Sequence, residues 1–265
     1  MMNIHWIIQE NLTKESLVKE LQQAVEADGA YADLIKIIPF SEELPEIYSQ
    51  NRFNIFYGST TLMLNAAKRY PQGVFYDATT FQMDSYLHHW GNEMLNAQAK
   101  LITLGQFSQE DINPTKEFFV RPNDDAKGFS GQVVDFATIQ QWVAQYDPNN
   151  YSVIQPNLEI IVAPPQNIHK EWRNFVVDGK VVSASRYLLN GQLSKSSEDI
   201  PDEMLAYTEA RCQEFMPHPI FVMDIALCNG QYKVIECNCF NGTGFYDHDI
   251  PTIVQAVNGY IRKKL

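Results

Sequence analysis

Three oxygen-bearing side chains stand out near the end of the sequence. Glu236 and Asn238 lie two apart at the end of the apolar run VIECN, and Asp224 interrupts the earlier apolar run PIFVMDIALC. Residues two apart on a strand point to one face, roughly 6–7 Å from each other. Carboxylate and amide oxygens without His or Cys suit Mg²⁺. The pattern is typical of a magnesium site, but an acid and an amide on a solvent-facing strand fit it as well.

The loop between these two strands decides whether the carboxylates meet. A two-residue turn at 229–230 puts Asp224 and Glu236 on opposite sides of the sheet, whereas a three-residue loop at 229–231 pairs them directly. The three-residue loop also collects the apolar residues on the other face: Met223, Ile225, Leu227, Ile235 and Cys237. We therefore expect the three-residue loop. Two opposed carboxylates raise the pKa of one of them unless a cation lies between them.

The segment FVRPNDDAKGFSG carries two cations and a glycine-containing turn. Arg121 is placed at a strand end, Lys127 follows, and the turn Gly128-Phe-Ser130-Gly131 offers backbone amides that could meet a phosphate. The segment does not fit the P-loop pattern, because no Gly-Lys-Ser/Thr opens a helix. An exposed hairpin with solvated charges is the alternative interpretation.

The segment EWRNFVVDGKVVSASRY predicts a hairpin with charged residues on one face. Glu171 and Arg173 share a strand face, the pair Asp178-Gly179 favours a tight turn, and the returning strand brings Arg186 back toward them. Basic side chains directed at an acidic metal site suit a polyanion such as a triphosphate. A cross-strand ladder of salt bridges is the alternative.

The elements that must position these residues change in character along the chain. The N-terminal part alternates strands and helices and predicts a small parallel sheet, with strands at 3–9, 32–38, 53–59 and 74–77 and helices at 15–27 and 60–70. Residues 82–105 are expected to be helical with a break at Gly91. Beyond a boundary near 108–116, hairpin signals predict antiparallel sheets, with strands at 117–122, 151–155, 158–163, 172–177, 180–187, 220–228 and 231–238 and helices at 137–146 and 203–216.

Composition limits the class of protein. The 265 residues are 45% hydrophobic and 20% charged, which is typical of a globular chain and not of a disordered one. The formal net charge of −12 argues against nucleic acid or an anionic membrane as a partner. No long apolar run or basic leader is present, so a cytoplasmic location is expected. The four cysteines lack paired zinc-site spacing and are expected to be free thiols.

The motifs FVRP, KGFSG, EWRNFVVDGKVV, VMDIA and IECN, in this order, resemble the ATP-grasp superfamily of carboxylate–amine ligases. The resemblance covers residues 117–250, and the alternating region before it resembles the pre-ATP-grasp domain. Within the superfamily the chain looks most similar to small bacterial and phage proteins in which arginine replaces the first ATP-binding lysine. The implied fold is α/β plus α+β, with a parallel-sheet domain at 1–112 and an ATP-grasp domain at 113–265, divided into a small ATP-binding lobe (113–163) and a metal-binding lobe (164–265).

The resemblance also implies a site in which ATP lies between two antiparallel sheets. Its nucleotide contacts would be Arg121, Lys127, Gly128, Ser130, Gly131 and Glu171, with Ile161, Val162 and Ala163 of the hinge strand LEIIVAPP at the adenine. Its Mg²⁺ ligands would be Asp224, Glu236 and Asn238. Its catalytic cations, at the γ-phosphate or an acyl phosphate, would be Arg173, Lys127 and Arg186.

The function that the resemblance implies is ATP- and Mg²⁺-dependent ligation of a carboxylate substrate to an amine acceptor, either a small molecule or a peptide, through an acyl phosphate. A phosphotransferase on the same fold and a non-catalytic nucleotide-binding module are the alternatives. The intact set Asp224, Glu236 and Asn238 counts against the module. Asn241 either extends the metal motif or caps the following turn, and the turn at 246–249 either approaches the acceptor or is a polar surface turn.

Overall fold

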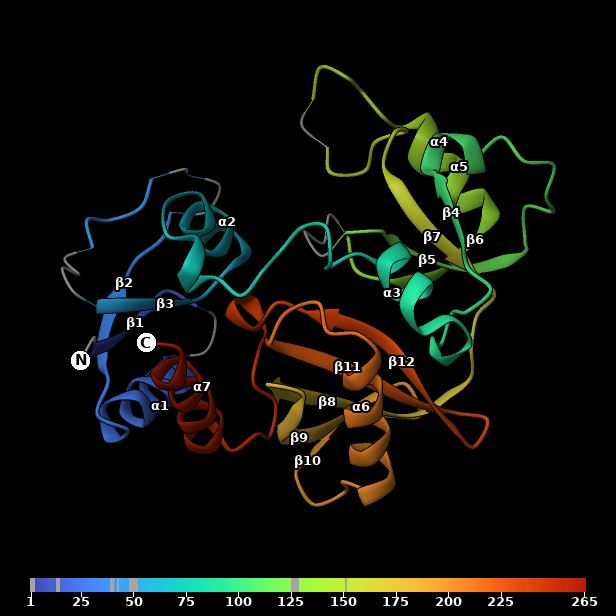
Figure 1. Cartoon of the computed structure of the whole chain (residues 1–265). Coiled ribbons are helices and arrows are strands. Elements are labelled where there is room, and N and C mark those ends of the chain that lie inside the picture. The colour runs from blue at the N-terminus through green and yellow to red at the C-terminus, as the bar shows by residue number, and fades with distance from the viewer. Residues whose placement is uncertain are drawn as a thin grey trace.

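The protein is built on three β-sheets, each forming the centre of one lobe (Figure 1). The computed structural model describes residues 3–12, 15–38, 41, 43–47, 52–124, 129–150 and 152–265. We call the lobes the first lobe, with a three-stranded parallel sheet, the small lobe, with a four-stranded antiparallel sheet, and the large lobe, with a five-stranded antiparallel sheet. Among the described residues, no helix combines the length and apolar character needed to cross a membrane.

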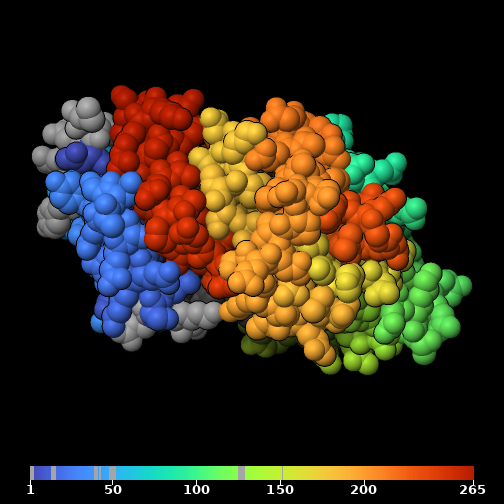
Figure 2. Space-filling model, turned by 90° about the horizontal axis from the view of Figure 1, so that it is seen from below, coloured from blue at the N-terminus to red at the C-terminus, as the bar shows by residue number. Residues whose placement is uncertain are grey.

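The first lobe joins both ends of the chain. Its elements are β1 (Asn3–Gln9), α1 (Glu15–Ala27), β2 (Tyr31–Ile35), β3 (Arg52–Tyr57), α2 (Thr60–Arg69), η1 (Pro71–Gly73) and α7 (Ile250–Lys264). The sheet order is β2-β1-β3 and all pairings are parallel, as predicted. α7 packs beside α1, and in Figure 2 the C-terminal segment lies against the N-terminal one. Residues 74–77, expected to form a fourth strand, do not pair in this sheet.

The small lobe includes a strand that lies before the predicted domain boundary. Its elements are β4 (Lys100–Thr103), α4 (Leu104–Phe107), β5 (Glu117–Pro122), β6 (Gln132–Asp135), α5 (Phe136–Ala144) and β7 (Glu159–Ala163), with sheet order β4-β7-β5-β6. The helical prediction for 82–105 is wrong at β4, because Lys100 pairs with Val162 on the central strand β7. The strand expected at 151–155 is absent from the described residues 152–155.

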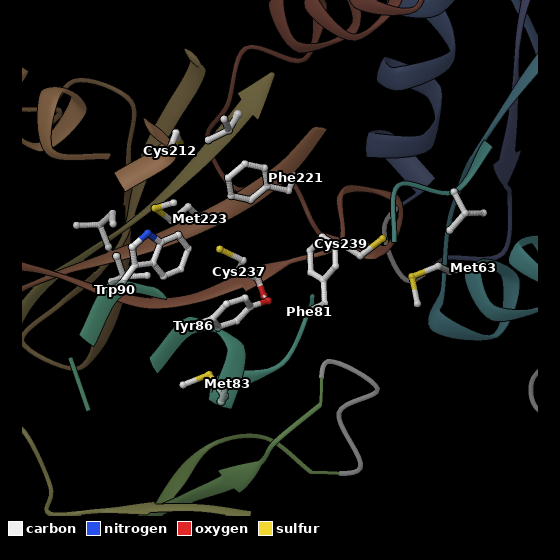
Figure 3. Close-up of a cluster of buried hydrophobic side chains, with 14 of the residues drawn as sticks. Met63, Phe81, Met83, Tyr86, Trp90, Cys212, Phe221, Met223, Cys237 and Cys239 are labelled. Atoms are coloured by element: carbon white, nitrogen blue, oxygen red, sulfur yellow. The ribbon is translucent and has the colours of Figure 1, made fainter. Parts of the chain in front are cut away.

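The large lobe carries two helices on one face of its sheet. Its elements are β8 (Ile168–Val177), β9 (Lys180–Leu189), β10 (Gln192–Ser196), α6 (Asp202–Glu214), β11 (Ile220–Cys228), β12 (Gln231–Asn238) and η3 (Phe240–Gly242), in sheet order β10-β9-β8-β11-β12. α3 (Met83–Trp90) and η2 (Gly91–Glu93) lie between the small lobe and this sheet. Figure 3 shows Tyr86 and Trp90 of α3 against Met223 and Cys237, in one buried cluster with Trp172. The other face of the sheet is left to the polar residues.

Tight turns connect the large-lobe strands. Asp178 and Gly179 have φ of 52° and 76°, so the predicted two-residue hairpin is confirmed. Asn190 and Gly191 form a second such turn, which leads into β10 and was not predicted. Gly91 ends α3 with φ of 50°, as the predicted break required.

The hairpin of β11 and β12 corrects one prediction. The loop has two residues, not three, because Cys228 pairs with Gln231 and both Asn229 and Gly230 have positive φ. Asp224 nevertheless pairs with Glu236, since the register shifts by one between Ile225 and Asp224 and leaves Ile235 as an extra residue. A β-bulge therefore does what the three-residue loop was expected to do.

Asn241 fastens the loop after β12 to the first lobe. Its side-chain amide donates to Phe56 O at 2.5 Å and to Gly73 O at 3.1 Å, and its Oδ1 accepts from Phe75 N at 2.6 Å. The side chain is fully buried, so these groups have no water to replace it. Its bonds explain why residues 74–77 need no strand partner.

We expect Asn241→Ala to lower the free energy of unfolding by about 3 kcal/mol, because it leaves buried backbone groups without their partner. Urea unfolding followed by circular dichroism measures this. Asn167→Ala is the matched control, since Asn167 is exposed, and it should change stability by less than about 0.5 kcal/mol. Equal stability of the two variants would show that the Asn241 bonds contribute nothing.

Candidate functional site

Asp224 is the centre of the polar face of the large-lobe sheet. On β11 it pairs with Arg173 of β8 on one side and with Glu236 of β12 on the other. Arg173 holds it with two bonds, Nε to Oδ1 at 2.9 Å and Nη2 to Oδ2 at 2.7 Å. Asn238 donates from Nδ2 to Asp224 Oδ2 at 3.3 Å. Asp224 is 1% exposed, so this bidentate pair neutralises a buried charge.

A second ion pair crosses from the small lobe to the large lobe. Arg121, on β5, contacts Glu236 Oε2 through Nη1. Arg121 Nε donates to its neighbour Pro122 O at 3.1 Å, which fixes the direction of the guanidinium. The three predicted metal ligands, Arg121 and Arg173 therefore lie in one network.

A third carboxylate, Glu171, lies beside this network. Tyr187 donates its hydroxyl to Glu171 Oε2 at 2.5 Å. Burial raises the pKa of Glu171, and the charges of Asp224 and Glu236 raise it further, although the Tyr187 bond opposes the shift. The site thus carries three acidic groups, Glu171, Asp224 and Glu236, against the cations Arg121 and Arg173.

Two tyrosines that were not predicted as site residues surround Arg173. Its guanidinium carbon lies 4.9 Å from the Tyr246 ring centre and 5.6 Å from the Tyr187 ring centre, and the two rings stack on each other. Burial lowers the pKa of Arg173, but the charge and hydrogen bonds of Asp224 outweigh it, so the pKa is raised overall. Arg173 is therefore a permanent cation in a fixed orientation.

A cavity of about 590 Å³ lies between the small-lobe and large-lobe sheets. Arg121, Glu236, Glu171 and Tyr187 line its polar part. Its apolar lining comes from Phe119, Phe129, Val133, Ile168, Leu188 and Ile235, with Leu95 among them. The cavity is large enough for a nucleotide-sized ligand, with apolar walls and convergent charges.

The turn predicted to close over phosphates is described in part. Ser130 and Gly131 line the cavity. A Cβ at Gly131 would lie 2.8 Å from the Phe119 ring, so only glycine lets this segment approach β5 so closely. Lys127 and Gly128 lie outside the described residues.

The predicted hinge residues lie elsewhere. Ile161, Val162 and Ala163 on β7 do not line the cavity and are at most 5% exposed. β7 is an inner strand, with β4 and β5 on either side, and its side chains enter hydrophobic clusters instead. The apolar cavity wall is supplied mainly by β5, β8, β9 and β12.

Arg186 does not join Arg173. It pairs in register with Trp172, so it belongs to the helix-covered face of the sheet, where its Nε lies 3.2 Å from Asp199 Oδ2. The register shift between Trp172 and Glu171 makes Tyr187 the extra residue, and Tyr187 reaches the cavity in its place. The sequence carried the signal only as an aromatic residue next to the predicted arginine.

The loop after β12 has mostly structural contacts. Asn241 belongs to the first-lobe junction and not to the carboxylate network. Asp249 caps α7 by accepting from Thr252 N, and Asp247 accepts from Ser197 N at 2.9 Å. Tyr246 is the member of the 246–249 turn that faces the site, through its contact with Arg173.

The donor set suits a hard divalent cation. Asp224, Glu236 and Asn238 present oxygen atoms on one sheet face, with no sulfur or imidazole among them. Among the described residues, no group of three or more His, Cys, Asp and Glu side chains has a metal-binding arrangement. The site offers two carboxylates and an amide, which fits a cation that keeps waters and shares its coordination with phosphates.

A family model described as an ATP-grasp domain, family 3 of its clade, matches residues 66–257. The chain belongs to this ATP-grasp family. No curated protein matches it. The resemblance drawn from the sequence motifs is thereby confirmed at the level of the superfamily.

Solved ATP-grasp structures share the fold over nearly the whole chain. The ligase PsnB, complexed with a phosphomimetic variant of a minimal precursor, Mg and ADP, has a TM-score of 0.59 at 12% identity, covering 98% of this chain and 99% of that one. D-alanine–D-alanine ligase from Bacillus anthracis has 0.57 at 12% identity, covering 99% and 97%. A RimK domain ATP-grasp protein from Sphaerobacter thermophilus has 0.62 at 10% identity, covering 97% and 98%.

His248 predicts how stability of this ATP-grasp protein depends on pH. Burial lowers the pKa of His248 to about 3, and the charge of Arg173 adds to the effect. Below its ordinary pKa the unfolded chain takes up a proton that the folded protein does not, so stability is lost as pH falls. Between about pH 7 and pH 5 we expect this group to lower the free energy of unfolding by about 2 kcal/mol.

His248→Phe tests this by urea unfolding at both pH values. The variant keeps a ring against Phe175 and loses the Ser183 bond at either pH, so only the titration differs. Its loss of stability on acidification should be smaller than that of the wild type by about 2 kcal/mol. An unchanged difference would mean that His248 takes up its proton in the folded protein.

Proposed function

We propose that this protein is an ATP-dependent carboxylate–amine ligase. The observation that supports it most is the pairing of Asp224 with Glu236, with Asn238 on the same face and Arg173 and Arg121 as counter-cations, at a cavity between two antiparallel sheets. Membership of the ATP-grasp family supports the use of ATP.

The cavity suits the nucleotide in one orientation. Its apolar walls, including Phe119, Ile168 and Leu188, are suited to a purine base, and the opposite part places Arg121 near Ser130 and Gly131 for the phosphates. Arg173 lies behind the Arg121–Glu236 pair and outside the cavity lining, held by Asp224. The γ-phosphate is therefore expected between the two arginines, at the end where the carboxylates gather.

The chemistry that we propose makes a poor electrophile reactive. A substrate carboxylate oxygen attacks the γ-phosphorus, ADP leaves, and an acyl phosphate forms. An amine then attacks the acyl carbon, phosphate leaves, and the amine loses a proton to solvent. Mg²⁺, held by Asp224, Glu236 and Asn238, would neutralise phosphate charge. Arg173 and Arg121 stabilise the charge that develops on the transferring group, and the two sheets exclude water from the acyl phosphate.

The similar structures suggest which substrates to screen. PsnB was solved with a precursor peptide, and the Bacillus anthracis protein is a D-alanine–D-alanine ligase. We therefore propose amino acids and short peptides as the first carboxylates and amines. Tyr246, beside Arg173, lies at the side of the site from which a second substrate would approach.

The metal assignment is tested by calorimetry of ATP binding with and without Mg²⁺. Asp224→Asn and Glu236→Gln should each weaken Mg²⁺-dependent binding at least about tenfold, because each removes one anionic ligand. Asp199→Asn is the control, since Asp199 binds Lys170 and Arg186 on the other face. Undiminished binding in both site variants would remove the metal site and leave only the fold.

Turnover is tested by ADP release with mixtures of amino acids and peptides. Arg173→Gln should lower kcat about 100-fold, since the arginine acts where charge develops in the transition state. Arg186→Gln, on the helix-covered face, should keep most of the rate. An equal loss in both variants would restore Arg186 to the site or show that Arg173 acts only through folding.

A further inference from the structure

One ion pair joins the two lobes that face each other across the cavity. Arg121 belongs to β5 of the small-lobe sheet, and Glu236 belongs to β12 of the large-lobe sheet. Their side chains are only 9% and 18% exposed. The pair of Arg173 and Asp224, by contrast, lies between neighbouring strands of one sheet. Contact between Arg121 and Glu236 is therefore a contact between lobes, and that of Arg173 with Asp224 is not.

The Arg121 guanidinium occupies an oxygen that a metal ion would use. Its Nη1 contacts Glu236 Oε2, so a divalent cation at the same oxygen would meet a like charge at close range. A cation can bind Glu236 well only if Arg121 moves away. Moving Arg121 away takes a mostly buried guanidinium from its anion, which is unfavourable. Metal binding to Glu236 therefore requires a new anionic partner for Arg121.

Nucleotide phosphates would supply that partner. Arg121 lines the cavity together with Ser130 and Gly131, where the phosphates are expected. Arginine binds phosphate oxygens bidentately, and so replaces a single carboxylate contact by a stronger one. Once Arg121 has turned to the phosphates, Glu236 has exchanged a nearby cation for a nearby carboxylate, that of Asp224. Both the phosphates and Glu236 then favour a divalent cation.

We propose that the Arg121–Glu236 ion pair couples the binding of nucleotide and metal: phosphates draw Arg121 from Glu236, and Glu236 then binds the divalent cation. The inference rests on the proposed function, because it requires a nucleoside triphosphate in the cavity. Coupling is reciprocal, so the cation must strengthen nucleotide binding by the same factor. Arg173 stays on Asp224 throughout, because both its bonds lie within one sheet.

The first experiment measures Mn²⁺ binding without nucleotide, by electron paramagnetic resonance of the free ion. Arg121→Gln should bind Mn²⁺ at least about fivefold more tightly than the wild type, since the competing cation is gone. Arg262→Gln, which removes an arginine paired with Asp28 in the first lobe, should bind as the wild type does. Equal Mn²⁺ affinity in Arg121→Gln and the wild type overturns the proposal.

The second experiment measures ATP affinity by calorimetry in EDTA and in Mn²⁺. The ratio of the two affinities should be smaller in Arg121→Gln than in the wild type, and chelation of Mn²⁺ by ATP in solution cancels in this comparison. An unchanged ratio overturns the proposal. Should Arg121→Gln fail to fold by circular dichroism, Arg121→Lys replaces it in both experiments, with a smaller change in the same direction expected and no change overturning the coupling. A wild type that binds no ATP with Mg²⁺ would instead overturn the proposed function.

Discussion

The site depends on the cost of bringing several carboxylates together on one buried sheet face. Asp224 is almost fully buried, Glu236 is largely buried, and their charges contribute to the raised pKa of Glu171. Such groups are unfavourable in a protein interior unless cations and hydrogen bonds accompany them. Arg173 neutralises Asp224 from the adjacent strand, and Arg121 neutralises Glu236 from the other lobe. The placement of the arginines thus follows from the placement of the acids.

Two β-bulges determine which side chains reach this face. A shift of one residue in a strand moves every following side chain to the other side of the sheet. In β12 the bulge at Ile235 lets a two-residue turn coexist with opposed carboxylates. In β9 the bulge at Tyr187 sends the tyrosine to the cavity and Arg186 to the helix-covered face. The chemistry of the site therefore rests on two local irregularities in otherwise regular hairpins.

These irregularities explain what could be predicted from the sequence. The pairing of Asp224 with Glu236 was predictable, because alternation of polar and apolar residues reports faces directly. The loop that achieves it was not, because a bulge and an odd loop give the same segregation near Glu236. Arg186 was misplaced for the same reason. β4 was missed because four residues carry too little periodicity to compete with a helical pattern, and its pairing with β7 comes from distant sequence. Ile161 was assigned to the adenine because an apolar strand does not reveal whether it faces a cavity or a core.

The two arginines meet their carboxylates under different mechanical conditions. The loop that follows β12 is fixed to the first lobe by Asn241, by Gly58 N on Asn241 O at 2.8 Å, and by the Tyr57 hydroxyl on Thr243 O at 2.8 Å. Arg173 also donates to Gly244 O in this loop. Asp224, Asn238 and Arg173 are therefore held by neighbouring strands of one sheet and a buried junction. Arg121 reaches Glu236 across a cavity, from a separate sheet. A ligand that changes the charge in the cavity acts first on the second pair, because fewer fixed contacts oppose its rearrangement.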